Sequence, residues 1–173
     1  MKISFLLLLT VVSLSLYAGD GIQFSHGTWK ETLAKAKVEN KLIFVDVYTS
    51  WCGPCKLMAK DVFPQKEVGD KFNESFVNYK VDAEKGEGID IARKYSVSGY
   101  PTYLFIDGDG TLFYRSMGSR SVESFLQEAD NALAEFHDPK PLMAWEAEYP
   151  TRKNDKAFLY EYLKKRQKMG LES

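Results

Sequence analysis

Cysteine and histidine are scarce in this sequence, because the 173-residue chain contains two residues of each type. Two cysteines cannot build the multi-disulfide scaffold of a small secreted domain. A zinc site would need two further ligands, and the histidines, His26 and His137, lie at unsuitable spacing from the cysteine pair. We therefore predict no metal site, and we interpret Cys52 and Cys55 as reactive rather than structural residues.

The chain also lacks an excess of charge of either sign. Its 23 Lys and Arg residues nearly balance its 24 Asp and Glu residues, which leaves a formal net charge of −1. Nucleic-acid-binding domains usually carry a clear positive excess. We therefore expect no nucleic acid among the partners. The hydrophobic content of 45% suffices for one domain with a core and a modest extension.

The N-terminal apolar stretch is short for a membrane span. Ile3–Tyr17 is an apolar run of about 15 residues, whereas a spanning helix needs about 20. Lys2 precedes the run, and the small residues Ala18 and Gly19 follow it. These features predict a signal peptide over residues 1–18 and an exported mature protein, periplasmic or extracellular. The alternative is an uncleaved membrane anchor.

The two cysteines lie on a predicted strand-to-helix turn. The residues before them, Leu42–Tyr48, are mainly apolar, β-branched or aromatic and predict a buried strand. The residues after them, Lys56–Lys60, are good helix formers, and Pro54 is tolerated in a first helical turn. The positive end of the helix dipole lowers the pKa of a nearby thiol. A Cys-x-x-Cys pair in this position indicates a thioredoxin-like redox motif.

The rest of the chain up to residue 137 predicts further strands and helices in alternation. Apolar spacing and turn signals predict strands at 76–82, 102–106 and 111–115, with a hairpin turn at 107–110. Capping residues and helical spacing predict helices at 28–40, 55–62, 65–73, 89–95 and 121–136. We expect these elements to form one domain over residues 19–137.

The region 138–173 is predicted to be a linker followed by one amphipathic helix. Pro139 and Pro141 mark the linker. A helix capped by Asn154 or Asp155 should run through Lys168, with an apolar stripe on one face. We interpret its basic face as solvated rather than as a surface for a membrane or an acidic partner. The stripe could dock on the domain or on a partner, and the chain could be a truncated form of a longer protein.

Three motifs carry a resemblance to a known family. The stretch Trp51–Cys55 matches the active-site pentapeptide of the thioredoxins, Asp46 matches their buried acid, and Gly99–Thr102 resembles their cis-proline loop. The resemblance covers Phe24–Phe136 and implies an α/β thioredoxin fold, with a central mixed β-sheet flanked by helices. The chain resembles exported bacterial thioredoxin-like proteins and the C-terminal domain of the transmembrane thiol-disulfide interchange reductases.

Cys52, Cys55 and Asp46 are the predicted catalytic residues. Cys52 should attack, because it lies nearer the helix start and is expected to be the more exposed; Cys55 should then resolve the mixed disulfide. Asp46 could take the proton from Cys55, since apolar neighbours would raise its pKa. The alternative is an aspartate that faces solvent. Many thioredoxins place a lysine near this acid, where this chain has Asn78; Lys80 has the same strand parity and could substitute.

The predicted substrate-binding residues surround the cysteines. The resemblance implies that a cis peptide bond precedes Pro101 and that the backbone at Tyr100 pairs with a substrate chain like an added strand. An ordinary trans proline at the start of a strand is the alternative. Trp51 should cover the disulfide rather than fill the core. The substrate-binding set is Trp51, Gly53, Pro54, Tyr100 and Pro101.

These residues predict an exported thiol-disulfide oxidoreductase that reduces disulfides of other exported proteins. The Gly53-Pro54 pair between the cysteines resembles that of reductases. No dissociable cofactor is expected, but an upstream electron donor is needed because the bacterial periplasm is oxidising; a membrane thiol-disulfide reductase is the candidate donor. Two alternatives stay open: a thiol oxidase or isomerase with the same residues, and a thioredoxin-like binding module in which the cysteines are idle.

Overall fold

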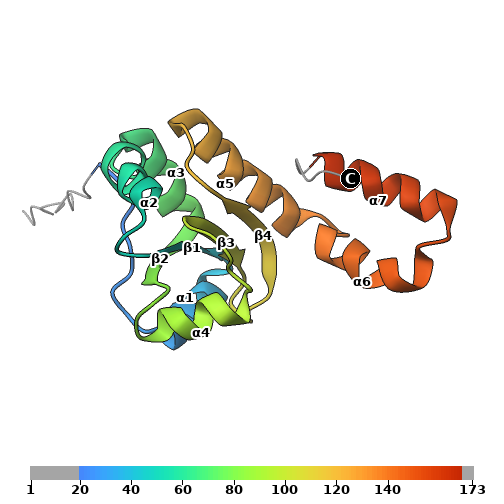
Figure 1. The fold of residues 1–173 in the computed structure, drawn as a ribbon, viewed down its shortest axis with the longest axis horizontal. Coiled ribbons are helices and arrows are strands. Elements are labelled where there is room, and N and C mark those ends of the chain that lie inside the picture. Colours follow the sequence, from blue (N-terminus) through green and yellow to red (C-terminus); the bar gives the residue numbers. More distant parts are fainter. Residues whose placement is uncertain (1–19, 169–173) are drawn as a thin grey trace, which may run out of the picture.

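The computed structural model describes residues 20–168 (Figure 1). The predicted signal peptide, residues 1–18, lies outside this range. Within the described range, no helix is both long enough and apolar enough to cross a membrane. The elements in chain order are α1 (Trp29–Glu39), β1 (Leu42–Tyr48), α2 (Gly53–Leu57), the π-helix η1 (Met58–Val62), α3 (Lys66–Ser75), β2 (Phe76–Asp82), α4 (Glu87–Lys94), β3 (Thr102–Ile106), β4 (Leu112–Met117), α5 (Val122–His137), α6 (Leu142–Arg152) and α7 (Lys156–Lys168).

The four strands form one mixed sheet in the order β2-β1-β3-β4. β1 pairs in parallel with β2 and antiparallel with β3, and β3 pairs antiparallel with β4. β1 is buried along nearly its whole length, because it lies inside the sheet and helices cover both faces (Figure 1). The predicted mixed sheet flanked by helices is confirmed.

Two local signals in the sequence set the ends of elements. Thr28 and Glu31 form the predicted capping box, in which each side chain accepts a hydrogen bond from the backbone N–H of the other residue. Gly110 has a φ of +83° in the turn between β3 and β4, a conformation that favours glycine. Both predictions hold because they depend only on short-range interactions.

The two faces of the sheet carry cores of different character. On one face, η1, α3 and α5 pack over Phe44, and the rings of Phe72 and Phe125 stack with 4.6 Å between their centroids. On the other face, α1 and α4 pack over aliphatic residues such as Ile43 and Val45. Side chains alternate along a strand, so Asp46 lies on the same face as Phe44. The acid therefore shares a face with the helices that follow the cysteines.

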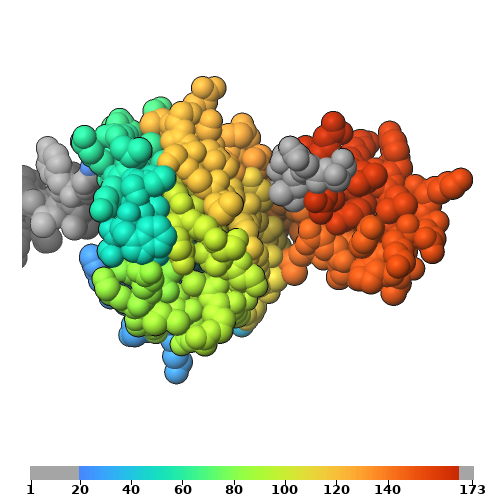
Figure 2. All heavy atoms as spheres, viewed as in Figure 1, coloured from blue at the N-terminus to red at the C-terminus, as the bar shows by residue number. Residues whose placement is uncertain are grey.

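The C-terminal region differs from the prediction. Instead of a linker followed by one helix, it forms two helices: α6 leads away from the end of α5, and α7 returns toward it (Figure 1). The linker prediction is wrong for residues 142–152, because Pro141 stands at the N-cap of α6 and Pro150 lies inside the helix near its end. Figure 2 shows the pair as a lobe beyond α5.

Aromatic contacts and ion pairs hold the two helices of this lobe together and join them to α5. Trp145 of α6 packs against Phe158 of α7, with 5.3 Å between ring centroids. The side chain of Glu135, near the end of α5, is buried; it accepts a hydrogen bond from Leu142 N–H at 2.7 Å and pairs with Lys165 of α7. The lobe is thus fastened at both its first and its last turns, and α7 docks on the chain itself.

Candidate active site

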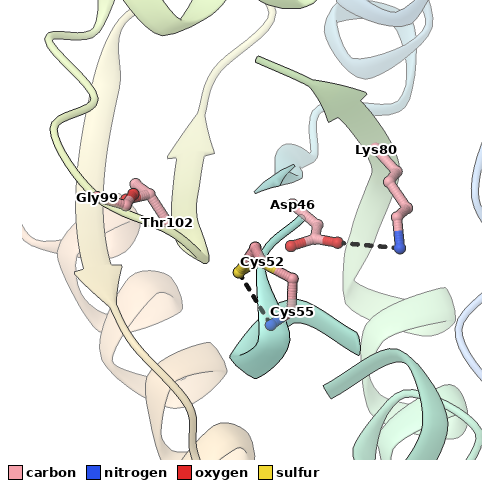
Figure 3. The surroundings of a disulfide bond; sticks show 6 residues. All are labelled: Asp46, Cys52, Cys55, Lys80, Gly99 and Thr102. Atoms are coloured by element: carbon pink, nitrogen blue, oxygen red, sulfur yellow. Dashed lines mark hydrogen bonds and ion pairs between the residues drawn. A yellow bond between two sulfur atoms is a disulfide. The ribbon is translucent and has the colours of Figure 1, made fainter. Parts of the chain in front are cut away.

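Cys52 and Cys55 form a disulfide at the turn between β1 and α2 (Figure 3). Cys52 is the N-cap of α2, and Pro54 occupies the first turn, as predicted. The backbone N–H of Cys55 donates to Cys52 Sγ at 3.1 Å. The same N–H group would stabilise negative charge on Cys52 Sγ after reduction, because it already points at that atom.

The expectation that Cys52 is the more exposed cysteine is wrong for this disulfide form. Cys52 is 3% exposed and Cys55 is 5% exposed. The bond to Cys55 turns the Cys52 sulfur toward the first turn of the helix, and the exposed surface at this turn belongs to Trp51, Gly53 and Pro54. The assignment of Cys52 as nucleophile therefore rests on its place at the helix start alone.

Asp46 lies on β1 and is 1% exposed. One carboxylate oxygen, Oδ2, lies 3.3 Å from Lys80 Nζ. The other oxygen, Oδ1, has no hydrogen-bond partner among the described residues. Burial raises the pKa of Asp46 to about 6, against the opposing effect of the Lys80 charge. The carboxyl can therefore change protonation state near neutral pH, as a proton acceptor for Cys55 would have to do.

Lys80, and not Asn78, lies beside Asp46, so Lys80 substitutes for the lysine that many thioredoxins place near this acid. Asp46 and Lys80 are direct partners in the parallel register of β1 and β2, which explains why strand parity pointed to this lysine. Asn78 instead donates to the side chain of Asn73 at 3.0 Å and to the backbone oxygen of Gln23. In Figure 3 the Asp46 carboxylate faces Lys80 on one side and the disulfide on the other.

The peptide bond between Tyr100 and Pro101 is cis. Thr102 Oγ1 donates to the Gly99 carbonyl at 2.7 Å, and Gly118 N–H donates to the Pro101 carbonyl at 2.8 Å. These bonds fix the loop opposite the cysteines (Figure 3). The ring of Tyr100 meets the exposed ring of Trp51 edge to face, 5.8 Å between centroids, so the structure brings these two predicted substrate-binding residues together.

Three residues near the disulfide were not predicted. Glu84 Oε1 accepts a hydrogen bond from Trp51 Nε1 at 3.0 Å and so orients the indole. Leu57 and Met117 add exposed apolar surface beside the turn and the loop. Glu84 carries no signal in the sequence, because it meets Trp51 only through the fold. Leu57 follows Cys55 by two residues, and its exposure could have been inferred from helical spacing.

The described residues contain no group of three or more His, Cys, Asp or Glu side chains that could hold a metal ion. The cysteine pair is the redox-active group of this thioredoxin-like site. A dithiol–disulfide pair exchanges two electrons and two protons with another disulfide without further groups.

The model of the thioredoxin-like domain family matches residues 29–133, and the chain belongs to that family. A solved structure of a candidate disulphide isomerase from Bacteroides thetaiotaomicron is 45% identical, with a TM-score of 0.60. The match covers 67% of this chain and 96% of that chain. The domain therefore has the fold and the cysteine pair of a thioredoxin-like thiol-disulfide oxidoreductase.

Two thioredoxins are also similar to this chain. A thioredoxin from Thermus thermophilus is 26% identical with a TM-score of 0.60, over 68% of this chain and 91% of that one. Thioredoxin H4 of Arabidopsis thaliana is 35% identical over 82 residues, 47% of this chain and 65% of the relative. The matches to the first curated relatives span between 44% and 65% of their lengths.

Proposed function

We propose that this protein is an exported thiol-disulfide oxidoreductase that reduces disulfides of other exported proteins. The observation that carries the proposal is the disulfide between its only two cysteines, placed opposite the cis-proline loop and above a buried acid. Family membership supports the reaction class. The sequence of residues 1–18 supports export, and N-terminal sequencing of the exported protein should then begin near Gly19.

The reaction starts from the dithiol form. The Cys52 thiolate attacks one sulfur of the substrate disulfide, which forms a mixed disulfide and releases the first substrate thiolate. Cys55 passes its proton to Asp46, and the Cys55 thiolate attacks Cys52 Sγ. This second step forms the Cys52–Cys55 disulfide and releases the second substrate thiolate, so two electrons reach the substrate. An upstream donor, for which a membrane thiol-disulfide reductase is suited, returns the pair to the dithiol.

Trapping of the mixed disulfide tests this assignment. Cys55→Ser removes the second attack and leaves the first possible, so the variant should accumulate covalent complexes with exported proteins, visible on a non-reducing gel and cleared by added thiol. Cys52→Ser should accumulate almost none. Equal trapping by both variants would contradict the roles of the two cysteines, and no trapping by either would favour a binding module.

The direction of electron flow separates the reductase from a thiol oxidase or isomerase with the same residues. The redox state of the cysteines in the native compartment, measured by alkylation of free thiols, should be mainly reduced for a reductase. A stable disulfide in that compartment would instead indicate an oxidase.

A further inference from the structure

The Lys80 ammonium lies among three aromatic rings. The ring centroid of Tyr48 lies 4.6 Å from Nζ, and those of Phe24 and Phe63 both lie 5.7 Å away. Asp46 Oδ2 lies 3.3 Å away from the same nitrogen. We propose that these three rings, hereafter the aromatic cage, position Lys80 against Asp46 and thereby set the pH range in which the acid can accept the proton of Cys55. The mechanistic part of this inference rests on the proposed function.

The cage comes from three separate segments of the chain, and two of its rings, Phe24 and Phe63, are held by contacts that do not involve Lys80. Phe24 precedes α1, and Ile22 N–H and Ser25 N–H donate to the backbone oxygens of Phe63 and Asn78 at 2.9 and 2.8 Å. These bonds hold the Phe24 segment in place. The rings of Phe24 and Phe63 also meet edge to face, 5.9 Å between centroids.

The lysine needs such positioning because its surroundings are partly open. Its side chain is 29% exposed, and it lines a cavity of about 350 Å³ together with Phe24, Phe63 and Asp20. A long lysine side chain in partial contact with water has many rotamers available. The negative faces of aromatic rings attract an ammonium group, so three rings around Lys80 Nζ favour the position in which this atom lies 3.3 Å from Asp46 Oδ2.

The other charged and titratable groups around this pair are few. Asp46 faces Lys80 on β2, the cysteine pair at the start of α2, and Tyr103, its register partner on β3. Burial first, and the Asp46 charge second, raise the pKa of Tyr103, so this phenol stays neutral near pH 7. Lys80 faces Asp46 and Tyr48 on β1 and shares the cavity with Asp20. Lys80 is thus the one cation beside Asp46 among these groups, and its position decides how strongly the carboxylate is stabilised.

A double-mutant cycle on Asp46 titration tests the proposal. The probe is the carboxyl carbon of Asp46, followed by NMR against pH in the oxidised protein, without substrate. Lys80→Met should raise the measured pKa of Asp46 by about 1 or more, because the opposing charge is lost. Phe24→Leu should raise it by roughly 0.5 when Lys80 is present and should change nothing in the Lys80→Met background.

Two control variants test whether the effect requires an aromatic ring at this place in the fold. Phe24→Tyr keeps a ring and should titrate like wild type, as should Phe113→Leu, which removes an aromatic residue that packs against Phe136 instead. Tyr48→Leu should repeat the Phe24→Leu result if the latter variant fails to fold. Three outcomes would overturn the proposal. The first is an equal effect of Phe24→Leu on the pKa of Asp46 with and without Lys80. The others are a lowered pKa of Asp46 in the ring variants, or no effect of either Phe24→Leu or Tyr48→Leu. Reductase activity is not needed for this measurement, so failure of the proposed function would appear separately, as absence of trapped complexes.

Discussion

Two acids in this chain are almost completely buried beside a lysine, but they differ in the partners of their second carboxylate oxygen. Asp46, below the disulfide, has one oxygen paired with Lys80 and one without a hydrogen-bond partner among the described residues. Glu135, at the end of α5, uses both oxygens: one pairs with Lys165, and the other accepts from Leu142 N–H. Lys165 also pairs with a second acid, because its Nζ lies 2.7 Å from Asp138 Oδ2.

Under the proposed function, we infer that this difference separates an acid that takes part in the reaction from a structural one. Each carboxylate oxygen of Glu135 has a partner, whereas Oδ1 of Asp46 has none within residues 20–168; a buried carboxylate with an unpartnered oxygen is less stabilised in its charged form and is closer to accepting a proton. Perturbed acids of this kind gather at functional sites. A buried acid beside a lysine therefore does not by itself indicate a functional site. The two regions are distinguished by the second carboxylate oxygen, which in the described part of the chain has no hydrogen-bond partner in Asp46 and has one in Glu135.

The largest effect should come from Asp46→Asn. This substitution keeps the shape of the side chain but removes the proton acceptor, so resolution of the mixed disulfide should slow by between about tenfold and a hundredfold, most visibly near neutral pH. Stopped-flow reduction of a model disulfide across pH 6 to 8 measures the rate. Equal rates for variant and wild type throughout that range would make Asp46 a core polar residue of the same kind as Glu135.

The second effect is on stability. Because the pKa of Asp46 is about 6 in the folded chain and 3.8 ordinarily, the folded state binds more protons between these values, and this group's contribution to stability falls as pH rises through them. At about 1.4 kcal/mol for each tenfold change in ionisation constant, the cost approaches about 3 kcal/mol at pH 7.5.

Asp46→Asn should remove this cost. Urea unfolding of the oxidised proteins should therefore show the variant more stable than wild type at pH 7.5 and similar to it at pH 4. A constant difference between the two proteins at both pH values would mean that Asp46 does not titrate in that window.

Glu135→Gln should act in the opposite direction and by less. It removes the charge that faces Lys165, and a loss of about 2 kcal/mol is expected, below the usual range for a broken buried pair because Asp138 still holds the lysine. The matched control is Glu123→Gln, on the exposed side of the first turn of the same helix. Disulfide reduction should be unchanged in both. A loss of activity in Glu135→Gln alone would break the distinction between the two acids.

The smallest effect is expected from truncation after Pro139, which removes α6 and α7. Glu135 then loses its contacts with Lys165 and Leu142 N–H and is hydrated instead. Truncation also removes Leu142, Phe158 and Tyr162 from the edge of the aromatic core, but Phe44, Phe72 and Phe125 keep their contacts with one another. Reduction of a model disulfide should stay within about twofold of the full chain, a difference of only about 0.4 kcal/mol in activation free energy. A truncated protein that fails to fold would show that Phe158 and Tyr162 belong to the core of the domain.

Much of the fold could be predicted because its signals are local. The uniformly apolar run at 42–48 indicated the buried strand, and strand parity pointed correctly to Lys80 as a neighbour of Asp46. The cis bond before Pro101 followed from the resemblance. The residues assigned to catalysis and substrate binding occupy the expected places, whereas their roles stay predictions.

The rest depended on contacts that a sequence does not display. Helix α6 was missed because Pro139 and Pro141, which precede it, were interpreted as a linker, although Leu142, Trp145 and Tyr149 recur at helical spacing. The nearly equal burial of Cys52 and Cys55 in the disulfide form depends on the surrounding fold, which the spacing of the two cysteines does not indicate. The aromatic cage joins residues from three distant segments, and no periodicity within any one of them indicates it.

The three tryptophans of the chain happen to lie in three different parts of the molecule. Trp51 is 65% exposed beside the disulfide, Trp29 packs against Tyr79 on the aliphatic side of the sheet, and Trp145 packs against Phe158 in the C-terminal lobe. Each is thus an optical reporter for one region. Variants that keep a single indole would allow the fluorescence of the active site, the far side of the sheet and the lobe to be followed separately. Coincident denaturation curves from all three would identify one cooperative unit, and an early transition at Trp145 alone would identify a lobe that melts by itself.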